Sequence, residues 1–156
     1  MLRKTGWCLA ALLLLLLPLT APAQVPALLP GRWTVYQIGF LADGTVPREM
    51  LERLNDPQVA DLNLAIERKE AELLVEFRAD GTYQFSITRN GQRTRAESGS
   101  YALKDGWLTA SSAAPDGSSF HDQQVTKLTK RMPVLTFSAD KSMPGVVEEI
   151  TYYRLK

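Results

Sequence analysis

The sequence predicts a mainly all-β fold, an eight-stranded antiparallel up-and-down barrel with a two-helix insertion after the first strand. From residue 73 to the C-terminus, apolar and polar residues alternate in short runs, as in half-buried strands. Asp-Gly or Asn-Gly pairs separate several of these runs, and such pairs favour tight hairpins. The segment 77–85, FRADGTYQF, shows both features at once. Eight successive strands can close on themselves and enclose side chains or one small ligand.

The first 23 residues are expected to be a signal peptide that is removed from the mature protein. Two basic residues precede an apolar run at residues 8–17, and a small-x-small cleavage pattern follows at residues 21–23. The run is well short of the roughly 20 residues that a membrane-spanning helix needs. We therefore expect export to the periplasm or beyond, with the mature chain starting near Gln24.

Composition narrows the functional classes of the mature chain. A flexible lead-in at residues 24–30 is expected to precede a single barrel domain at 31–156. Without the leader the chain carries sixteen basic and seventeen acidic residues, which predicts no broad attraction to nucleic acid or anionic membranes. The one cysteine, Cys8, lies in the leader and precedes the apolar run, so we expect no disulfide, no thiolate chemistry and no lipid anchor. A soluble monomer without membrane insertion is predicted.

The first strand is expected at residues 33–40, and two helices follow it. The first helix is predicted at residues 47–54; Asp56 and Pro57 then supply an N-cap and a first helical residue for the second. The two helices are predicted to lie over the barrel mouth as a mobile lid or a fixed plug. Their apolar residues are Met50, Leu51, Leu54, Val59, Leu62 and Ile66.

Seven further strands are expected after the helices. The sequence places them at residues 73–78, 83–88, 94–103, 107–112, 120–129, 133–138 and 146–155. Hairpin turns are predicted at residues 80–81, 90–91, 105–106 and 116–117, and Gly99 suggests a bulge or a bend.

One apolar face of these strands is predicted to point into the barrel. Its residues either fill the interior or line a cavity for a small hydrophobic or amphipathic molecule, and small barrels do both. Tyrosines among them would supply polar groups within an apolar wall, as ligand pockets do. The candidate ligand-binding residues are Val75, Phe77, Tyr83, Phe85, Tyr101, Leu135 and Phe137.

The sequence contains few side chains that could act in catalysis. His121 is the only histidine and the mature chain has no cysteine, so we expect no metal site and no cofactor. Ser118, His121 and Asp122 lie close in sequence, but no nucleophile-elbow pattern accompanies them. We therefore predict a protein that is not an enzyme and that binds a small molecule. The alternative is a protein-interaction or inhibitor module of the cell envelope with a solid barrel core.

Five short motifs resemble those of bacterial lipocalin-like domain proteins, in the lipocalin/calycin superfamily. They are Gly31-Arg32-Trp33, the turn in segment 77–85 (FRADGTYQF), and the segments 98–103 (SGSYAL), 105–111 (DGWLTAS) and 150–156 (ITYYRLK). The resemblance implies a small exported barrel in which the tryptophan seals one end beside an arginine of the last strand. Trp33 and Arg154 match those two positions. The inserted helices resemble the lid of fatty-acid-binding proteins, and the long C-terminal helix of typical lipocalins is missing, so no ligand class is carried over.

Overall fold

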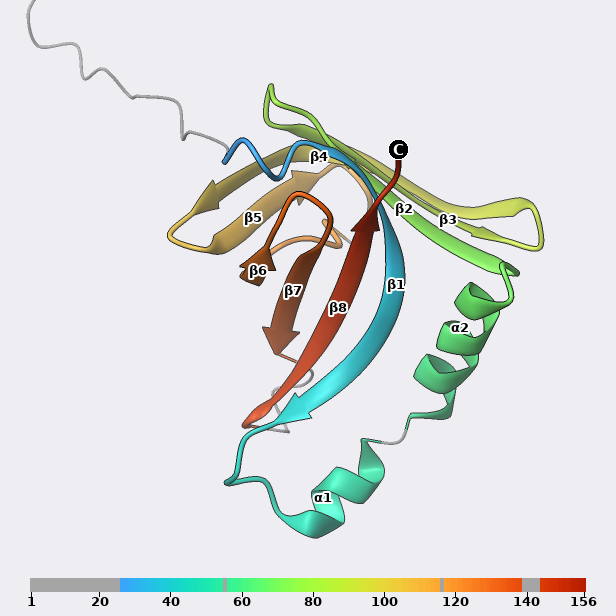
Figure 1. Cartoon of the computed structure of the whole chain (residues 1–156), viewed down its shortest axis with the longest axis vertical. Helices are drawn as coiled ribbons and strands as arrows, with labels where there is room; N and C mark the ends of the chain where they lie inside the picture. Colours follow the sequence, from blue (N-terminus) through green and yellow to red (C-terminus); the bar gives the residue numbers. More distant parts are fainter. Residues whose placement is uncertain (1–25, 55, 116, 139–143) are drawn as a thin grey trace, which may run out of the picture.

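The chain forms a closed antiparallel barrel of eight strands, each paired with the next and the last with the first (Figure 1). The computed structural model describes residues 26–54, 56–115, 117–138 and 144–156. The predicted fold class is therefore confirmed, whereas the expected signal peptide at 1–23 lies outside the described residues. The elements in chain order are β1 (Gly31–Ala42), α1 (Arg48–Arg53), α2 (Pro57–Glu67), β2 (Ala71–Phe77), β3 (Thr82–Arg89), β4 (Gln92–Lys104), β5 (Trp107–Ser112), β6 (Gln123–Leu128), β7 (Pro133–Ser138) and β8 (Val146–Arg154).

Local turn chemistry explains two of the hairpins. Asn90 and Asp105 adopt φ of 50° and 52°, and the glycine after each has φ of 77° and 80°. Two consecutive residues with positive φ match the twist of the flanking strands, and Asn-Gly and Asp-Gly accept this conformation most readily. The turns at 80–81, 90–91 and 105–106 lie where the sequence predicted them.

The fourth hairpin was predicted at 116–117, of which residue 116 lies outside the described residues, and no tight turn joins β5 to β6 there. β5 ends at Ser112 and β6 begins only at Gln123, and the two strands share just two pairs of residues. The intervening segment turns into the barrel and places Phe120 in the core, so that residue does not begin a strand. Of the bulge or bend expected at Gly99, the bulge is absent, because β4 keeps its register there with β3 and β5.

Gly99 has a different role, which is to let two strands and a ring approach closely. A Cβ built at this position would lie 1.9 Å from the carbonyl oxygen of Ser111 and 3.0 Å from the Tyr83 ring. The first distance is far below any real Cβ contact, and the second is so tight that the ring would have to shift. Any larger residue here would force β5 or Tyr83 to move.

The barrel closes between β1 and β8 as the sequence predicted. Trp33 lies opposite Arg154, and Val35 opposite Tyr152. The Arg154 guanidinium carbon lies 4.1 Å from the centre of the Trp33 ring, which is cation–π geometry. Trp33 and Arg154 are thus in contact, and their role in sealing one end of the barrel stays a prediction.

Residues 26–30 differ from the flexible lead-in that was expected. Leu29 is fully buried in the core, and its carbonyl oxygen accepts a hydrogen bond of 2.8 Å from the Trp33 indole. The Arg154 guanidinium donates to the carbonyl oxygens of Leu28 at 2.7 Å and Pro30 at 3.1 Å. These contacts hold residues 26–30 against one end of the barrel. The prolines of the segment gave no indication of them in the sequence.

β1 and β2 pair only near the closed end, from Gly31 to Thr34. Beyond that point α2 packs against both strands (Figure 1). The Asn63 side chain donates to the Ile38 carbonyl oxygen at 2.7 Å and accepts from the Ile38 amide at 2.9 Å. One amide side chain thereby supplies two bonds of the kind that a neighbouring strand provides.

α2 forms where its capping signals predicted it. The Asp56 carboxylate accepts a hydrogen bond of 2.8 Å from the Gln58 amide, and Pro57 occupies the first turn. Val59, Leu62 and Ile66 are partly buried against the barrel core, as their spacing predicted. No helix in the described part of the chain is long and apolar enough to cross a membrane.

Candidate binding site

The predicted inward face of the strands is buried. Phe137 belongs to β7, but its side chain lies outside the described residues. The remaining candidates are each 8 % exposed or less, and their role as ligand contacts stays a prediction. They are Val75, Phe77, Tyr83, Phe85, Tyr101 and Leu135.

Phe120 occupies the centre of this aromatic interior. Its ring lies 5.4 Å from the rings of Phe77 and Tyr83 and 5.3 Å from that of Phe85, measured between centroids. All three contacts are edge-to-face, the arrangement that aromatic rings prefer. The segment between β5 and β6 therefore fills this part of the barrel with a packed side chain.

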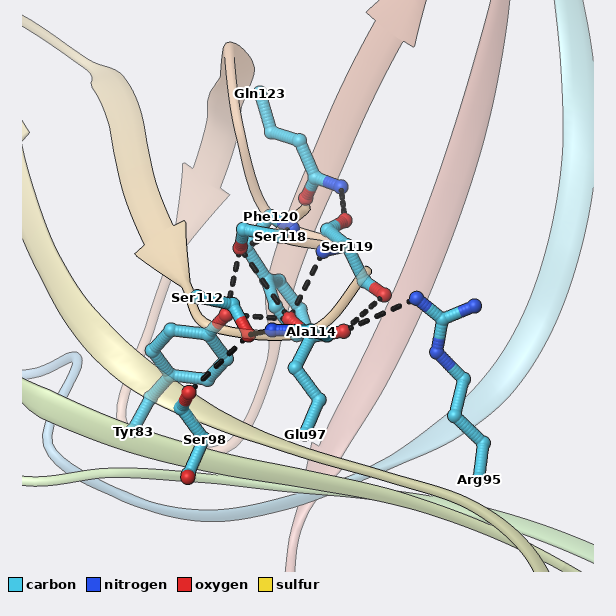
Figure 2. A network of polar contacts seen from close by, with 10 residues as sticks. All are labelled: Tyr83, Arg95, Glu97, Ser98, Ser112, Ala114, Ser118, Ser119, Phe120 and Gln123. Atoms are coloured by element: carbon cyan, nitrogen blue, oxygen red, sulfur yellow. Dashed lines mark hydrogen bonds and ion pairs between the residues drawn. The ribbon is translucent and has the colours of Figure 1, made fainter. Parts of the chain in front are cut away.

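A buried carboxylate, Glu97, holds the Phe120 segment in place (Figure 2). The side chain of Glu97 is 0 % exposed. It accepts hydrogen bonds from the Ser119 amide at 2.9 Å, the Ser119 hydroxyl at 2.7 Å and the Tyr83 hydroxyl. Ser118 donates to it at 3.3 Å, and Arg95 forms an ion pair with it at 3.2 Å. We call this group the Glu97 network.

The network favours an ionised carboxylate next to a protonated phenol. Burial alone would raise the pKa of Glu97, but hydrogen bonds from Tyr83 and Ser119 outweigh burial and lower that pKa below its ordinary value. Burial, and then the neighbouring carboxylate, raises the pKa of Tyr83 to about 12. Both groups therefore keep fixed protonation states near neutral pH, which suits a structural tether better than proton transfer.

One polar atom beside the network has no hydrogen-bond partner among the described residues. Gln123 donates from its side-chain nitrogen to the Ser119 carbonyl oxygen at 2.6 Å. Its side-chain oxygen is buried and accepts no hydrogen bond from any described residue.

Sequence reasoning did not single out Glu97, although a signal was present. Glu97, Gly99 and Tyr101 alternate along one strand, so they share a face. Because Tyr101 was predicted to point inward, the same alternation places the carboxylate inside. An inward-facing Glu in a barrel strand predicts a buried polar cluster, but the partners at 118 and 119 have no local signature.

The three candidate catalytic residues do not assemble. His121 is exposed; one ring nitrogen lies 3.1 Å from the Ala110 carbonyl oxygen and the other 3.3 Å from the Asp122 carboxylate. The Ser118 hydroxyl instead lies 2.6 Å from the Tyr83 hydroxyl. Within the described ranges, no three His, Cys, Asp or Glu side chains gather in a way that would hold a metal ion.

The largest hollow that we describe lies outside the packed interior, beside the point where β1 and β2 separate. Its volume is about 1050 Å³, and it lies between α2 and the neighbouring parts of β1, β2, β3 and β8; we call it the α2–β1 groove. The Tyr36 and Tyr153 rings pack against each other there, 4.7 Å apart and tilted by 51°. These tyrosines are 55 % and 42 % exposed, and Leu64 from α2 is 41 % exposed.

A second hollow of about 490 Å³ lies along β2, β3 and β4. Its side chains are mainly polar, and they include Arg32, Glu76 and Arg93. It has no exposed aromatic pair like that of the α2–β1 groove. We therefore take the α2–β1 groove as the candidate binding site.

Two comparisons with known protein sequences found no match for this chain. No protein-family model matches the sequence, and no curated protein matches it significantly. The closed eight-stranded barrel is consistent with a lipocalin-like fold, and membership of that superfamily stays a prediction.

Proposed function

We propose that this protein is a non-catalytic binding protein that takes up a small amphipathic molecule in the α2–β1 groove. One observation carries the proposal: a groove of about 1050 Å³ exposes two mutually packed tyrosine rings at its surface. Ligand sites of small molecules typically enclose about 300–1000 Å³ and combine apolar walls with a few polar groups. An eight-stranded barrel is compatible with ligand binding.

The packing of the interior supports the groove over the barrel centre as the site. Phe120 contacts the rings of three of the predicted ligand-binding residues. A ligand among them would have to displace this ring and break the Glu97 network that holds its segment. The groove requires no such rearrangement.

The arrangement of the polar side chains supports a non-catalytic role. His121 is exposed and separate from Ser118, and the buried Glu97 is saturated with hydrogen bonds. The proposal includes export, because residues 1–23 have the pattern of a cleaved leader.

The second candidate function is a protein-interaction module with a solid core. The aromatic packing around Phe120 favours it, because a filled barrel leaves binding to the outer surface. The two candidates differ in what the exposed tyrosines contact, a small molecule or another protein.

The experiment is a titration of the purified protein with N-phenyl-1-naphthylamine, an uncharged amphipathic dye whose fluorescence rises in apolar sites. We expect saturable binding with a micromolar Kd, weakened about tenfold or more by Tyr153→Ala, a loss of about 1.4 kcal/mol or more. Trp107→Ala is the matched control, because Trp107 is 49 % exposed on β5, outside the groove. Absence of saturable binding, or equal loss in both variants, would overturn the proposal.

A further inference from the structure

We infer that the barrel has a second binding site at the end where β1 stops and β8 begins, and that this site takes a small primary amine whose ammonium group binds Glu148 (Figure 1). The inference goes beyond the proposed function, because the site lies inside the barrel and not in the α2–β1 groove. Two independent features carry it. A carboxylate faces the interior without a cation, and a buried hydroxyl on the same face has no hydrogen-bond partner among the described residues.

Glu148 points into the barrel. The inward residues of β8 alternate along the strand: Val146 and Tyr152 are each 2 % exposed, and Ile150 packs against the core. Glu148 lies among them at the same spacing, so its side chain shares their face. The residue is only partly buried, and it lies opposite Phe40 near the end of β1. The carboxylate therefore belongs to the inner wall at a place that solvent still reaches.

The Glu148 carboxylate has no counter-charge in the described part of the chain. It forms no ion pair there, and no described group donates a hydrogen bond to it. The charged group that acts on it is Asp56, the N-cap of α2, which is itself acidic. Burial, and then Asp56, raises the pKa of Glu148 above its ordinary value. The inward carboxylate of Glu97 already has several donors, so a bound cation would offset the cost of burial at Glu148 and not at Glu97.

Tyr152 supplies the second feature. Buried tyrosine hydroxyls usually have a hydrogen-bond partner, but that of Tyr152 forms no hydrogen bond with any described residue. Among the described side chains, the fully enclosed polar atom without a partner is that of Gln123, so the Tyr152 hydroxyl oxygen borders space that a ligand can reach. Burial, and then the charge of Glu148, raises the pKa of Tyr152, so the two groups act on the same region. Carboxylate and phenol oxygens both accept hydrogen bonds, and an ammonium group carries three donors.

The surroundings of the two groups specify the rest of the ligand. Ile38 and Ile150 lie opposite each other on β1 and β8; Ile38 is 6 % exposed, and Ile150 packs against the core. The ring of Phe120 packs toward the other end, where its neighbour Phe77 lies opposite Gly31. A short apolar chain beside the ammonium group therefore suits this wall. A bare metal ion does not, because no three His, Cys, Asp or Glu side chains of the described segments gather to hold one.

The test compares hexylamine with hexanol, which has the same chain length and no charge, in NMR titrations of the isotope-labelled protein. Binding is followed at the methyl groups of Ile38 and Ile150 and at the Glu148 carboxyl carbon. At about pH 7.5 an alkyl ammonium group stays charged, since its pKa is near that of lysine, about 10.4. We expect saturable binding of hexylamine with a Kd about tenfold lower than that of hexanol, which corresponds to about 1.4 kcal/mol. Bound amine should also lower the pKa of Glu148, because an opposite charge favours the ionised form.

Matched variants on the two faces of β8 locate the source of this preference. Glu148→Gln is expected to reduce the ratio of the two Kd values to about twofold or less. Glu149→Gln is its control, because the neighbouring side chain points to the opposite face of β8, and it should keep the full ratio. Tyr152→Phe is expected to weaken hexylamine binding about threefold. Tyr153→Phe, on the opposite face, should leave it unchanged.

Each outcome decides the inference separately from the proposed function. Equal affinities for hexylamine and hexanol overturn it, and so does an equal loss of the preference in Glu148→Gln and Glu149→Gln. Absence of a saturable shift in the wild type up to about 10 mM hexylamine also overturns it, and that result depends on no variant. The dye titration concerns the α2–β1 groove, so its failure overturns the proposed function and leaves the Glu148 site in place.

Discussion

The barrel interior and the α2–β1 groove both contain tyrosines on strands, but these tyrosines differ in their exposure to solvent. Tyr83 is 1 % exposed, packs against Phe120 and bonds through its hydroxyl to Glu97. Tyr36 and Tyr153 are about half exposed and pack against each other. In the interior β2, β3 and β4 pair along their whole facing lengths, whereas β1 and β2 separate after Thr34.

This difference teaches that the packed barrel core and the candidate binding groove lie at different places in the fold. Where neighbouring strands stay paired, inward side chains meet and exclude water, and a carboxylate is accepted only with several donors. Where the strands separate, a helix takes over part of the pairing and leaves aromatic side chains in contact with solvent. The gap between β1 and β2 therefore exposes aromatic side chains without loss of the core.

The largest effect is expected from an interior substitution, Phe85→Ala. Phe85 is 8 % exposed and its ring contacts Phe120, so truncation should leave a cavity and lower the free energy of unfolding by about 3–5 kcal/mol. Urea denaturation measures this loss. Tyr36→Ala, an aromatic truncation in the groove, should lower it by less than about 1 kcal/mol. Similar small losses in both variants would show that the interior holds open space.

A smaller, pH-dependent effect is expected from Glu97→Gln. The carboxylate accepts charge-assisted and neutral hydrogen bonds from Tyr83, Ser119 and Arg95, so its neutralisation should lower the free energy of unfolding by about 2 kcal/mol at pH 7. Glu49→Gln on α1 is the exposed control and should change it by less than about 0.5 kcal/mol.

The sign of the pH dependence follows from the direction of the shift. The hydrogen bonds of the folded state lower the pKa of Glu97, so the unfolded chain binds the proton more readily. The stability from this carboxylate is fully present above its unfolded pKa, about 4.3, and is lost as pH falls through the lower folded pKa. The difference between wild type and Glu97→Gln should therefore shrink below about pH 4. A difference that stays constant down to pH 2 would contradict the network.

Features governed by short-range chemistry could be predicted from the sequence. The Asp105-Gly106 turn and the cap at Asp56 depend on residues within a few positions, and both formed as expected. The register of β1 and β8 is a long-range feature, yet Trp33 and Arg154 could be placed opposite each other because a family resemblance supplied the pairing.

Features that depend on distant partners could not be predicted. Phe120 lies in a segment whose alternation resembled a strand, and only the ring contacts across the barrel show that it packs in the core. The groove depends on where β1 and β2 stop pairing, which no local pattern of either strand records. Asn63 looked like an ordinary residue of α2, because its partner Ile38 lies 25 residues away in the chain.

The smallest and most local effect is expected from Asn63→Ala. The substitution removes both side-chain bonds to Ile38 and leaves two partly buried backbone groups without them, which should lower the free energy of unfolding by about 1–2 kcal/mol. Because Asn63 connects α2 to β1, amide exchange should accelerate within Pro57–Glu67 while β3 and β4 remain protected. Gln58→Ala, on the exposed surface of the same helix, should leave exchange unchanged. Slow exchange of α2 in the wild type, lost only in Asn63→Ala, would identify the helix as a fixed plug; fast exchange in both proteins would identify a mobile lid.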